Sequence, residues 1–251
     1  MEITAKRISK SLHSMLFGFI ALFFLGCGKS QNPAADIHQN ETKTIQMQVQ
    51  ADIGLLALGG QSVDYVATPP NYKPGDNLIT YEGPGWESQM VGYRLYLDGR
   101  NAIDVFGKKT TDMILKQVGR GDDYHQIQPW GMDILKVGAS LGSGGFGVHE
   151  NGEAVQIGPA AQFSAQILKN GPQMSIVEVN HKQSQKCGGD ITARYIIKSR
   201  SRLTRVEVDS QCRLPLVAGL VKHPKTTKIF QHDEGAGWSY IARYGGQSLV
   251  P

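Results

Sequence analysis

The stretch ITARYIIKSRSRLTRVEVDS, residues 191–210, decides the fold that this sequence predicts. Residues 191–198 and 203–210 have the apolar and β-branched composition of strands, and a polar Ser-Arg-Ser-Arg turn separates them. We therefore expect an antiparallel hairpin. Lys198, Arg200 and Arg202 alternate along it, which places them on its exposed face and in its turn.

Two cysteines flank this hairpin. Cys187 and Cys212 have their midpoint at Ser199 and Arg200, so a hairpin that turns there brings the two cysteines opposite each other. In the oxidising compartment of an exported protein, two such thiols pair. We expect a disulfide between Cys187 and Cys212, and two unpaired thiols are the alternative.

Short strand patterns recur outward from this hairpin, and helical periodicity is nearly absent beyond the N-terminal region. Asn151-Gly152 predicts a type I′ hairpin turn, which needs positive φ at both central residues, and Asn170-Gly171-Pro172 predicts another turn. The sequence therefore predicts an all-β protein, an antiparallel sandwich of two sheets in one domain. The other strands are expected at residues 42–50, 78–81, 91–97, 133–137, 146–149, 154–157, 164–168 and 175–180.

The N-terminal region has the features of a bacterial lipoprotein signal peptide. Lys6, Arg7 and Lys10 precede the apolar residues 15–25, which are too few to span a membrane as a mature helix. The run ends at Cys27 in a sequence that resembles a lipobox, where the cysteine is lipidated; ordinary cleavage nearby is the alternative. We expect a signal peptide at 1–26, a flexible tether at 27–41 and a folded domain at 42–251. The protein would then be exported and lipid-anchored to the bacterial cell envelope, facing the periplasm.

Composition and motifs argue against two classes of ligand. The formal net charge is +4 with scattered Lys and Arg, unlike the clustered basic footprint of a nucleic-acid binder. Gly142, Gly144 and Gly147 match the dinucleotide fingerprint, but they lead into a hairpin instead of a helix N-terminus. We expect no nucleic acid and no nucleotide, and an anionic small ligand instead. No recognised metal-ligand spacing is present, so no cofactor is predicted, although a divalent metal stays open.

A polar cluster at residues 124–136 indicates a binding site. His125, Trp130, Asp133 and Lys136 supply a titratable base, a flat stacking face, an acid and a cation. That mixture is typical of sites for polar, ring-shaped ligands.

Two further stretches could carry chemistry, and the first of them has the composition of a carbohydrate cleft. Sugars offer hydroxyls to charged side chains and an apolar face to aromatic rings. Core packing is the alternative for the tryptophan. The residues concerned are Trp86, Glu87, Arg94 and Arg100 in the first stretch, and Lys222 and His223 in the second.

Four blocks resemble the domain-of-unknown-function family 4861 (DUF4861) of polysaccharide-utilising bacteria. They are GPGWES at 83–88, VGYRLYLDGRNAIDVFGKK at 91–109, WGMDILKVGASLGSGG at 130–145 and GLVKHP at 219–224, and the similarity extends over 42–251. The resemblance implies an antiparallel, galactose-mutarotase-like β-supersandwich. Family members are longer and residues 240–251 are still strand-like, so we expect the domain to lack C-terminal strands.

The resemblance also implies an activity. At least one relative is similar to an oligosaccharide dehydratase of ulvan breakdown, which removes water from a terminal uronic acid and leaves a 4,5-unsaturated sugar. In such a β-elimination a base takes the C5 proton, and the C4 hydroxyl leaves with help from an acid.

Chemical reasoning assigns roles for this reaction. His125 is the expected base because histidine titrates nearest working pH, and Tyr124 or His223 is the expected acid. Arg94 and Lys136 are the expected cations at the substrate carboxylate, where charge develops. The expected substrate-binding residues are Trp86 and Trp130 for stacking, Glu87 and Asp133 for hydroxyls or for orienting the histidine, and Arg100 and Lys222.

Three other functions remain open at this point. A lyase would use the same chemistry to expel a sugar instead of water, so its products would be shorter. A non-catalytic glycan-binding lipoprotein would bind without forming an unsaturated product. A mutarotase-like epimerase would speed the interconversion of anomers.

Overall fold

The computed structural model describes residues 47–233 and 238–245. The chain divides into two units, Met1–Thr44 and Ile45–Pro251, and every described residue belongs to the second. The expected signal peptide, Cys27, the tether and the start of the strand expected at 42–50 therefore lie outside the described residues. Across the described ranges, no helix is long and apolar enough to cross a membrane.

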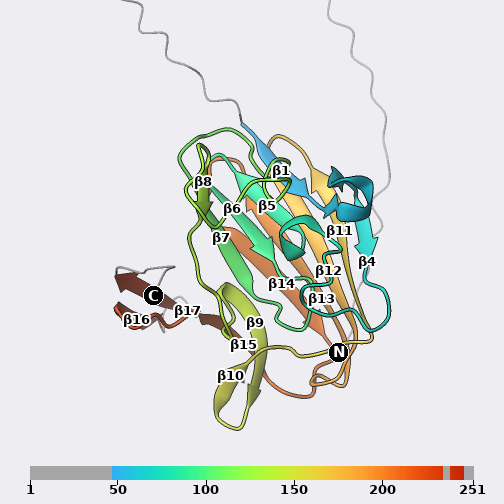
Figure 1. Ribbon diagram of the computed structural model, residues 1–251. Coiled ribbons are helices and arrows are strands. Elements are labelled where there is room, and N and C mark those ends of the chain that lie inside the picture. The colour runs from blue at the N-terminus through green and yellow to red at the C-terminus, as the bar shows by residue number, and fades with distance from the viewer. Residues whose placement is uncertain (1–46, 234–237, 246–251) are drawn as a thin grey trace, which may run out of the picture. The chain divides into compact units, whose positions relative to one another are not determined.

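Two five-stranded antiparallel sheets form a sandwich, which confirms the all-β prediction (Figure 1). β1 contacts β11 and β12, and β5 contacts β12 and β13, so the sheets pack face to face. The first sheet consists, in spatial order, of β1 (Val49–Asp52), β5 (Gly85–Ser88), β6 (Val91–Leu95), β7 (Ile103–Lys108) and β8 (Gly131–Asp133). The second sheet consists of β14 (Thr204–Ser210), β13 (Gly189–Lys198), β12 (Met174–Ser184), β11 (Gln162–Asn170) and β4 (Tyr65–Ala67).

Smaller elements surround the sandwich. A third sheet has the order β10 (Glu153–Val155), β9 (Ser143–Glu150) and β15 (Leu216–Leu220). Two-stranded pairs are formed by β2 (Gly54–Leu55) with β3 (Gln61–Ser62), and by β16 (Thr226–Asp233) with β17 (Trp238–Gly245). Short 3₁₀ helices occupy Leu56–Leu58 and Thr80–Glu82.

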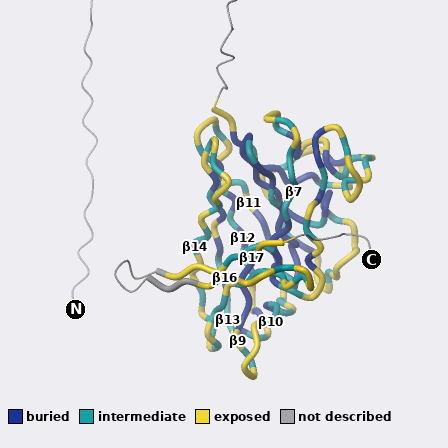
Figure 2. The backbone as a smooth tube through the Cα atoms, turned by 90° about the vertical axis from the view of Figure 1, so that its left-hand side faces the viewer, coloured by how far each residue is buried: buried dark blue, intermediate teal, exposed yellow. Residues whose placement is uncertain are grey.

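The core between the sheets follows from the period-two alternation of the second sheet. In β13, Ile191, Ala193, Tyr195 and Ile197 are each at most 1% exposed, while the residues between them are partly or fully exposed. From the first sheet, Trp86 stacks on Tyr195 with ring centroids 4.7 Å apart. Figure 2 shows buried residues through the middle of the molecule and exposed residues at the turns.

A second apolar cluster covers the other face of the first sheet. Phe106 of β7 packs there against Ile114, Leu115, Val118 and Trp130, which come from the segment between β7 and β8. All four residues of β5 are buried, since this strand has packed layers on both faces. The segment at 109–130 is therefore a third layer of the protein.

The hairpin that decides the fold is present as β13 and β14. The predicted disulfide joins Cys187 and Cys212, which is confirmed. The predicted register was wrong by two residues: Ile191 pairs with Ser210, which in a regular continuation would place Cys187 opposite Leu214.

An irregular step restores the approach of the two cysteines. Gly188 has φ of +72°, a left-handed conformation that glycine adopts without steric cost. Beyond the regular ladder, the N–H of Gln211 donates to the carbonyl of Asp190, and that of Arg213 donates to the carbonyl of Cys187. The hydrogen bond from Arg213 to Cys187 departs from the register of the ladder, and at this irregular step Cys212 lies next to Cys187.

Other local predictions had mixed outcomes. Asn151 and Gly152 have φ of +52° and +84° between β9 and β10, as a type I′ turn requires. The strand expected at 78–81 was wrong, because Tyr81 adopts φ of +43° in a 3₁₀ turn. The strand expected at 133–137 was also wrong in extent, because β8 ends at Asp133.

Candidate functional site

Two buried acidic residues fix the third layer to the first sheet, and Glu87 on β5 is one of them. Its carboxylate is 0% exposed and accepts hydrogen bonds from the N–H of Ile114 at 2.7 Å and of Leu115 at 2.9 Å. Lys108 Nζ lies 2.6 Å from the same carboxylate. Burial raises the pKa of Glu87, and these partners oppose the rise. The expected role of Glu87 in binding hydroxyls is wrong, because its acceptor positions are enclosed and filled.

Asp52 of β1 is the second anchor. Arg120 Nη2 lies 2.9 Å from Asp52 Oδ2, and the carboxylate is 0% exposed. The hydroxyl of Tyr81 donates to the same oxygen at 2.6 Å. Arg120 also donates to the carbonyls of Leu115 and Gly60, each at 2.7 Å. The segment at 109–130 is thus held near its start, where Ile114 and Leu115 bind Glu87, and in its middle, where Arg120 binds Asp52.

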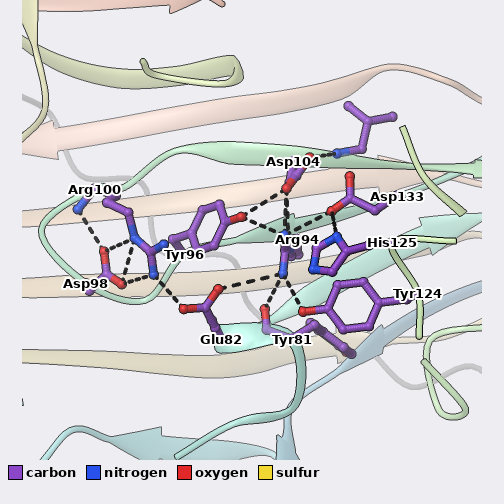
Figure 3. A network of polar contacts seen from close by, with 11 residues as sticks. Tyr81, Glu82, Arg94, Tyr96, Asp98, Arg100, Asp104, Tyr124, His125 and Asp133 are labelled. Atoms are coloured by element: carbon purple, nitrogen blue, oxygen red, sulfur yellow. Dashed lines mark hydrogen bonds and ion pairs between the residues drawn. The ribbon is translucent and has the colours of Figure 1, made fainter. Parts of the chain in front are cut away.

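Arg94 of β6 is the centre of a buried polar network (Figure 3). Its side chain is 1% exposed, and Nη2 lies 2.7 Å from Asp104 Oδ2 and 3.0 Å from Asp133 Oδ2. Arg94 pairs with Asp104 across β6 and β7, and Asp133 ends β8, so three strands of one sheet supply these groups. Buried charges require such pairing, because removing them from water is costly.

Tyrosines complete the hydrogen bonds of Arg94. Nη2 lies 2.6 Å from the hydroxyl of Tyr96, and Nη1 donates to the carbonyl of Tyr81 and to the hydroxyl of Tyr124, both at 3.1 Å. Nε donates to Asp104 at 3.2 Å. The prediction that Arg94 binds the substrate carboxylate directly is therefore wrong. Its guanidinium is buried and already shared by two carboxylates, so it positions its neighbours.

Asp133 has an unusual electrostatic setting. Burial, reinforced by the adjacent carboxylate of Asp104, raises the pKa of Asp133 to about 7, and Arg94 opposes this rise. The two carboxylates share one guanidinium, which offsets only part of the rise that burial causes. The carboxyl of Asp133 therefore changes its protonation state near neutral pH.

His125 lies at the exposed end of this network. Its Nδ1 is 3.4 Å from Asp133 Oδ2, while its side chain is 60% exposed. The N–H of His125 donates to Asp123 Oδ1 at 3.2 Å, and its ring lies 4.3 Å from that of Tyr124. A buried carboxylate that faces one imidazole nitrogen orients the ring and leaves the other nitrogen toward solvent. The structure thus brings together His125, Tyr124, Asp133 and Arg94, all expected as site residues.

The network continues to Arg100 through Glu82. The Glu82 carboxylate is 31% exposed, lies 4.0 Å from Arg94 Nη1 and accepts a hydrogen bond from Arg100 Nη2 at 3.0 Å. Arg100 also pairs with Asp98 at 2.6 Å and covers the ring of Tyr96 at 3.8 Å from its centroid. Figure 3 shows Arg100 and His125 at opposite ends of this chain of contacts.

The two tryptophans do not form sugar-stacking faces. Trp86 is 0% exposed in the core, where its indole N–H donates to Thr204 Oγ1 at 2.8 Å. Trp130 is 7% exposed and packs edge-on against Phe106. Its indole N–H points at Asp122, 3.3 Å away. Both stacking assignments are wrong, because the packed layers cover the two indole rings.

Three expected residues lie apart from the Arg94 network. Lys136 and Lys222 are exposed and have no ion pair with any described residue. His223 lines a separate cavity of about 150 Å³ together with Leu135 and Arg243. Of the two expected acids, Tyr124 rather than His223 is part of the network that holds His125.

Sequence reasoning did not identify Asp104 and Tyr96 as site residues. The signal was present in the strands, because Arg94 and Tyr96 are two residues apart and Asp104 lies on the next strand. A charged pair at facing positions of otherwise apolar strands indicates a buried ion pair. Among the described residues, no group of three or more His, Cys, Asp or Glu is placed to hold a metal ion.

A comparison with protein families identifies the family of this chain. A family model described as a domain of unknown function, DUF4861, matches residues 22–250. The chain belongs to the DUF4861 family. No significant match is found among curated proteins or among solved structures. The DUF4861 match includes every residue of the Arg94 network, from Tyr81 to Asp133.

Proposed function

We propose that this DUF4861 protein is a carbon–oxygen lyase that dehydrates the uronic acid at the non-reducing end of an oligosaccharide, such as those of ulvan. The observation that carries the proposal is the exposed imidazole of His125 with a buried carboxylate, Asp133, 3.4 Å from its Nδ1. A base of this kind is what the abstraction of a weakly acidic C–H proton requires.

His125 is the proposed general base. Its solvent-facing Nε2 takes the C5 proton of the uronic acid, and the electron pair of that C–H bond forms the C4–C5 double bond. Ionised Asp133 stabilises the imidazolium that results, because an opposite charge within about 4 Å favours the charged form. Arg94 acts as a positioning residue, since it holds Asp133 and Tyr124 in one arrangement.

Tyr124 is the proposed general acid. Burial raises the pKa of Tyr124, which keeps the phenol protonated at neutral pH, and Arg94 opposes the rise. The phenol donates its proton to the C4 oxygen as the C4–O bond breaks, so that water leaves. The guanidinium 3.1 Å away then faces the phenolate oxygen and stabilises its charge.

The charge that develops at the substrate carboxylate requires a cation with access to solvent. Since Arg94 is committed to Asp104 and Asp133, we assign this role to Lys136, which is exposed three residues after Asp133. A Lys ammonium on a flexible stem suits this role, because it can follow the substrate as a point charge.

The test is an incubation of the 251-residue chain with saturated, uronic-acid-ended oligosaccharides. Ultraviolet absorbance follows the conjugated product, and mass spectrometry gives its size. Absorbance with the loss of one water and no shortening supports the dehydratase. Absorbance with shorter products identifies a lyase that expels a sugar. Binding without absorbance identifies a glycan-binding protein and contradicts the proposal.

The proposed place of this reaction is the bacterial cell envelope. Lipidation at Cys27 would hold the enzyme on a membrane, facing the periplasm. Replacement Cys27→Ser should release the protein into the soluble periplasmic fraction. Membrane retention of this variant at the wild-type level would contradict the anchor.

A further inference from the structure

A cleft of about 950 Å³ lies next to the Arg94 network. Its walls come from residues 68–74, the turn at 98–100, strand β10 and residues 158–161. Its volume is at the upper end of the range for small-molecule sites in proteins, about 300–1,000 Å³. The cleft is thus large enough for more than a single small ligand group.

Arg100 connects this cleft to the proposed catalytic residues. It lines the cleft and donates to Glu82, which lies 4.0 Å from Arg94. Its Nε and Nη2 are bound to Asp98 and Glu82, whereas Nη1 has no hydrogen-bond partner in the described part of the chain. The two N–H donors of Nη1 are therefore available to a ligand in the cleft.

The remaining polar residues of the cleft suit hydroxyl groups. Gln156 donates through Nε2 to the carbonyl of Ser140, which leaves its amide oxygen as an acceptor, and Gln185 is exposed. Amides both donate and accept, as sugar hydroxyls do. Tyr72 adds an aromatic ring, and burial, with Asp98 and Glu82 nearby, raises its pKa to about 12, so that it stays a neutral phenol.

The charges of the cleft nearly balance. Its lining contains the three cations Lys73, Arg100 and Lys186 and the two acids Asp98 and Glu153. Arg100 is paired with Asp98, and Lys186 with Glu150. A polyanion would require a clear excess of cations, and an apolar ligand would leave these groups without partners. A polar ligand with little charge fits better.

We propose that this cleft binds the sugars that follow the terminal uronic acid, with Tyr72, Gln185 and Arg100 as their contacts. The assignment of the following sugars to this cleft rests on the proposed function, which places the terminal uronic acid of the oligosaccharide at His125. The cleft then determines how strongly chain length affects binding.

The test is a calorimetric titration with saturated oligosaccharides of two and of four sugars, each with a uronic acid at the non-reducing end. The variant Tyr72→Ala/Gln185→Ala should bind the four-sugar ligand about tenfold more weakly, equivalent to about 1.4 kcal/mol, and the two-sugar ligand with less than about a twofold change. The matched control is Tyr65→Ala/Gln166→Ala, an exposed pair on β4 and β11 outside the cleft. This control should bind both ligands as the wild type does.

An equal loss for both lengths, or no loss, would overturn the cleft as the site of the following sugars. Measuring product separates this result from the proposed function. Length-dependent loss of binding without any unsaturated product supports the cleft and contradicts the dehydratase. If product forms, but binding depends on ligand length to the same extent in the variant and the wild type, the cleft proposal is contradicted and the proposed function is not. No binding of either ligand by the wild type contradicts both proposals.

Discussion

Asp133 Oδ2 lies 3.0 Å from the buried guanidinium of Arg94 and 3.4 Å from the exposed imidazole of His125. One oxygen thus connects the packed interior of the first sheet to a solvent-facing base.

Replacing His125 with alanine should remove the proposed general base. General acid–base groups contribute about 10²- to 10⁴-fold, so we expect kcat on uronic-acid oligosaccharides to fall at least about 100-fold with little change in binding. Steady-state kinetics checks the fall, and calorimetry checks binding. His149→Ala is the matched control, because His149 is an exposed histidine on β9 outside the network. Unchanged turnover in His125→Ala would remove His125 from the role of base.

Asp133 should make stability depend on pH in a defined direction. Because its pKa is raised in the folded state to about 7, from 3.8, the folded protein binds more protons than the unfolded chain between these values. The stability that Asp133 contributes is therefore fully present below about pH 4 and is lost as the pH rises through 7. Urea unfolding of the wild type and of Asp133→Asn should show the variant gaining on the order of 2–3 kcal/mol relative to wild type between pH 5 and pH 8. A constant difference over this range would contradict the raised pKa.

Arg94→Met should destabilise the protein strongly. The substitution leaves the carboxylates of Asp104 and Asp133 buried without their cation, and breaking such a pair costs about 3–5 kcal/mol. The control is Arg194→Met on β13, whose partner is Glu178 and whose side chain is 51% exposed. Exposed pairs contribute less than about 1 kcal/mol, so the control should stay near wild type. Chemical denaturation measures both, and equal effects would mean that the Arg94 network contributes no more than a surface pair.

Arg120→Met should loosen the segment that carries His125. The change removes the ion pair to Asp52 and the hydrogen bonds to three carbonyls, so the amides of residues 114–125 should exchange hydrogen faster. We expect kcat to fall as this segment loosens, while binding of oligosaccharides is retained. Hydrogen exchange detected by mass spectrometry tests the first effect. Exchange at the wild-type rate would show that the anchor at Asp52 is dispensable.

Reduction of the disulfide should lower stability without changing the site. A closed loop with a sequence separation of 25 residues constrains the unfolded chain by roughly 3 kcal/mol. The double variant Cys187→Ala/Cys212→Ala should unfold at correspondingly lower urea concentration and retain its turnover. A fall in turnover at denaturant-free conditions would indicate that the disulfide also positions catalytic groups.

The sequence predicted the hairpin and the disulfide because period-two alternation and cysteine spacing are local properties. The register was missed, since the strands pair two residues away from the predicted alignment, and the two cysteines meet only through an irregular step beside Gly188 that no alternation reveals. Residue chemistry likewise predicted His125, Tyr124, Asp133 and Arg94 as site residues, and the structure places these four together. It could not identify Trp86 and Glu87 as buried, because β5 is covered on both faces and burial there arises from a segment far along the chain.

The third layer at 109–130 has a consequence for how this protein loses activity. Its apolar residues form one cluster with Phe106 of the first sheet, and its polar anchors end on β1 and β5. A surface lid could detach by itself. A layer whose apolar side chains pack into one cluster with the supporting sheet unfolds together with that sheet. Inactivation by heat should therefore coincide with global unfolding, and no folded but inactive intermediate should accumulate.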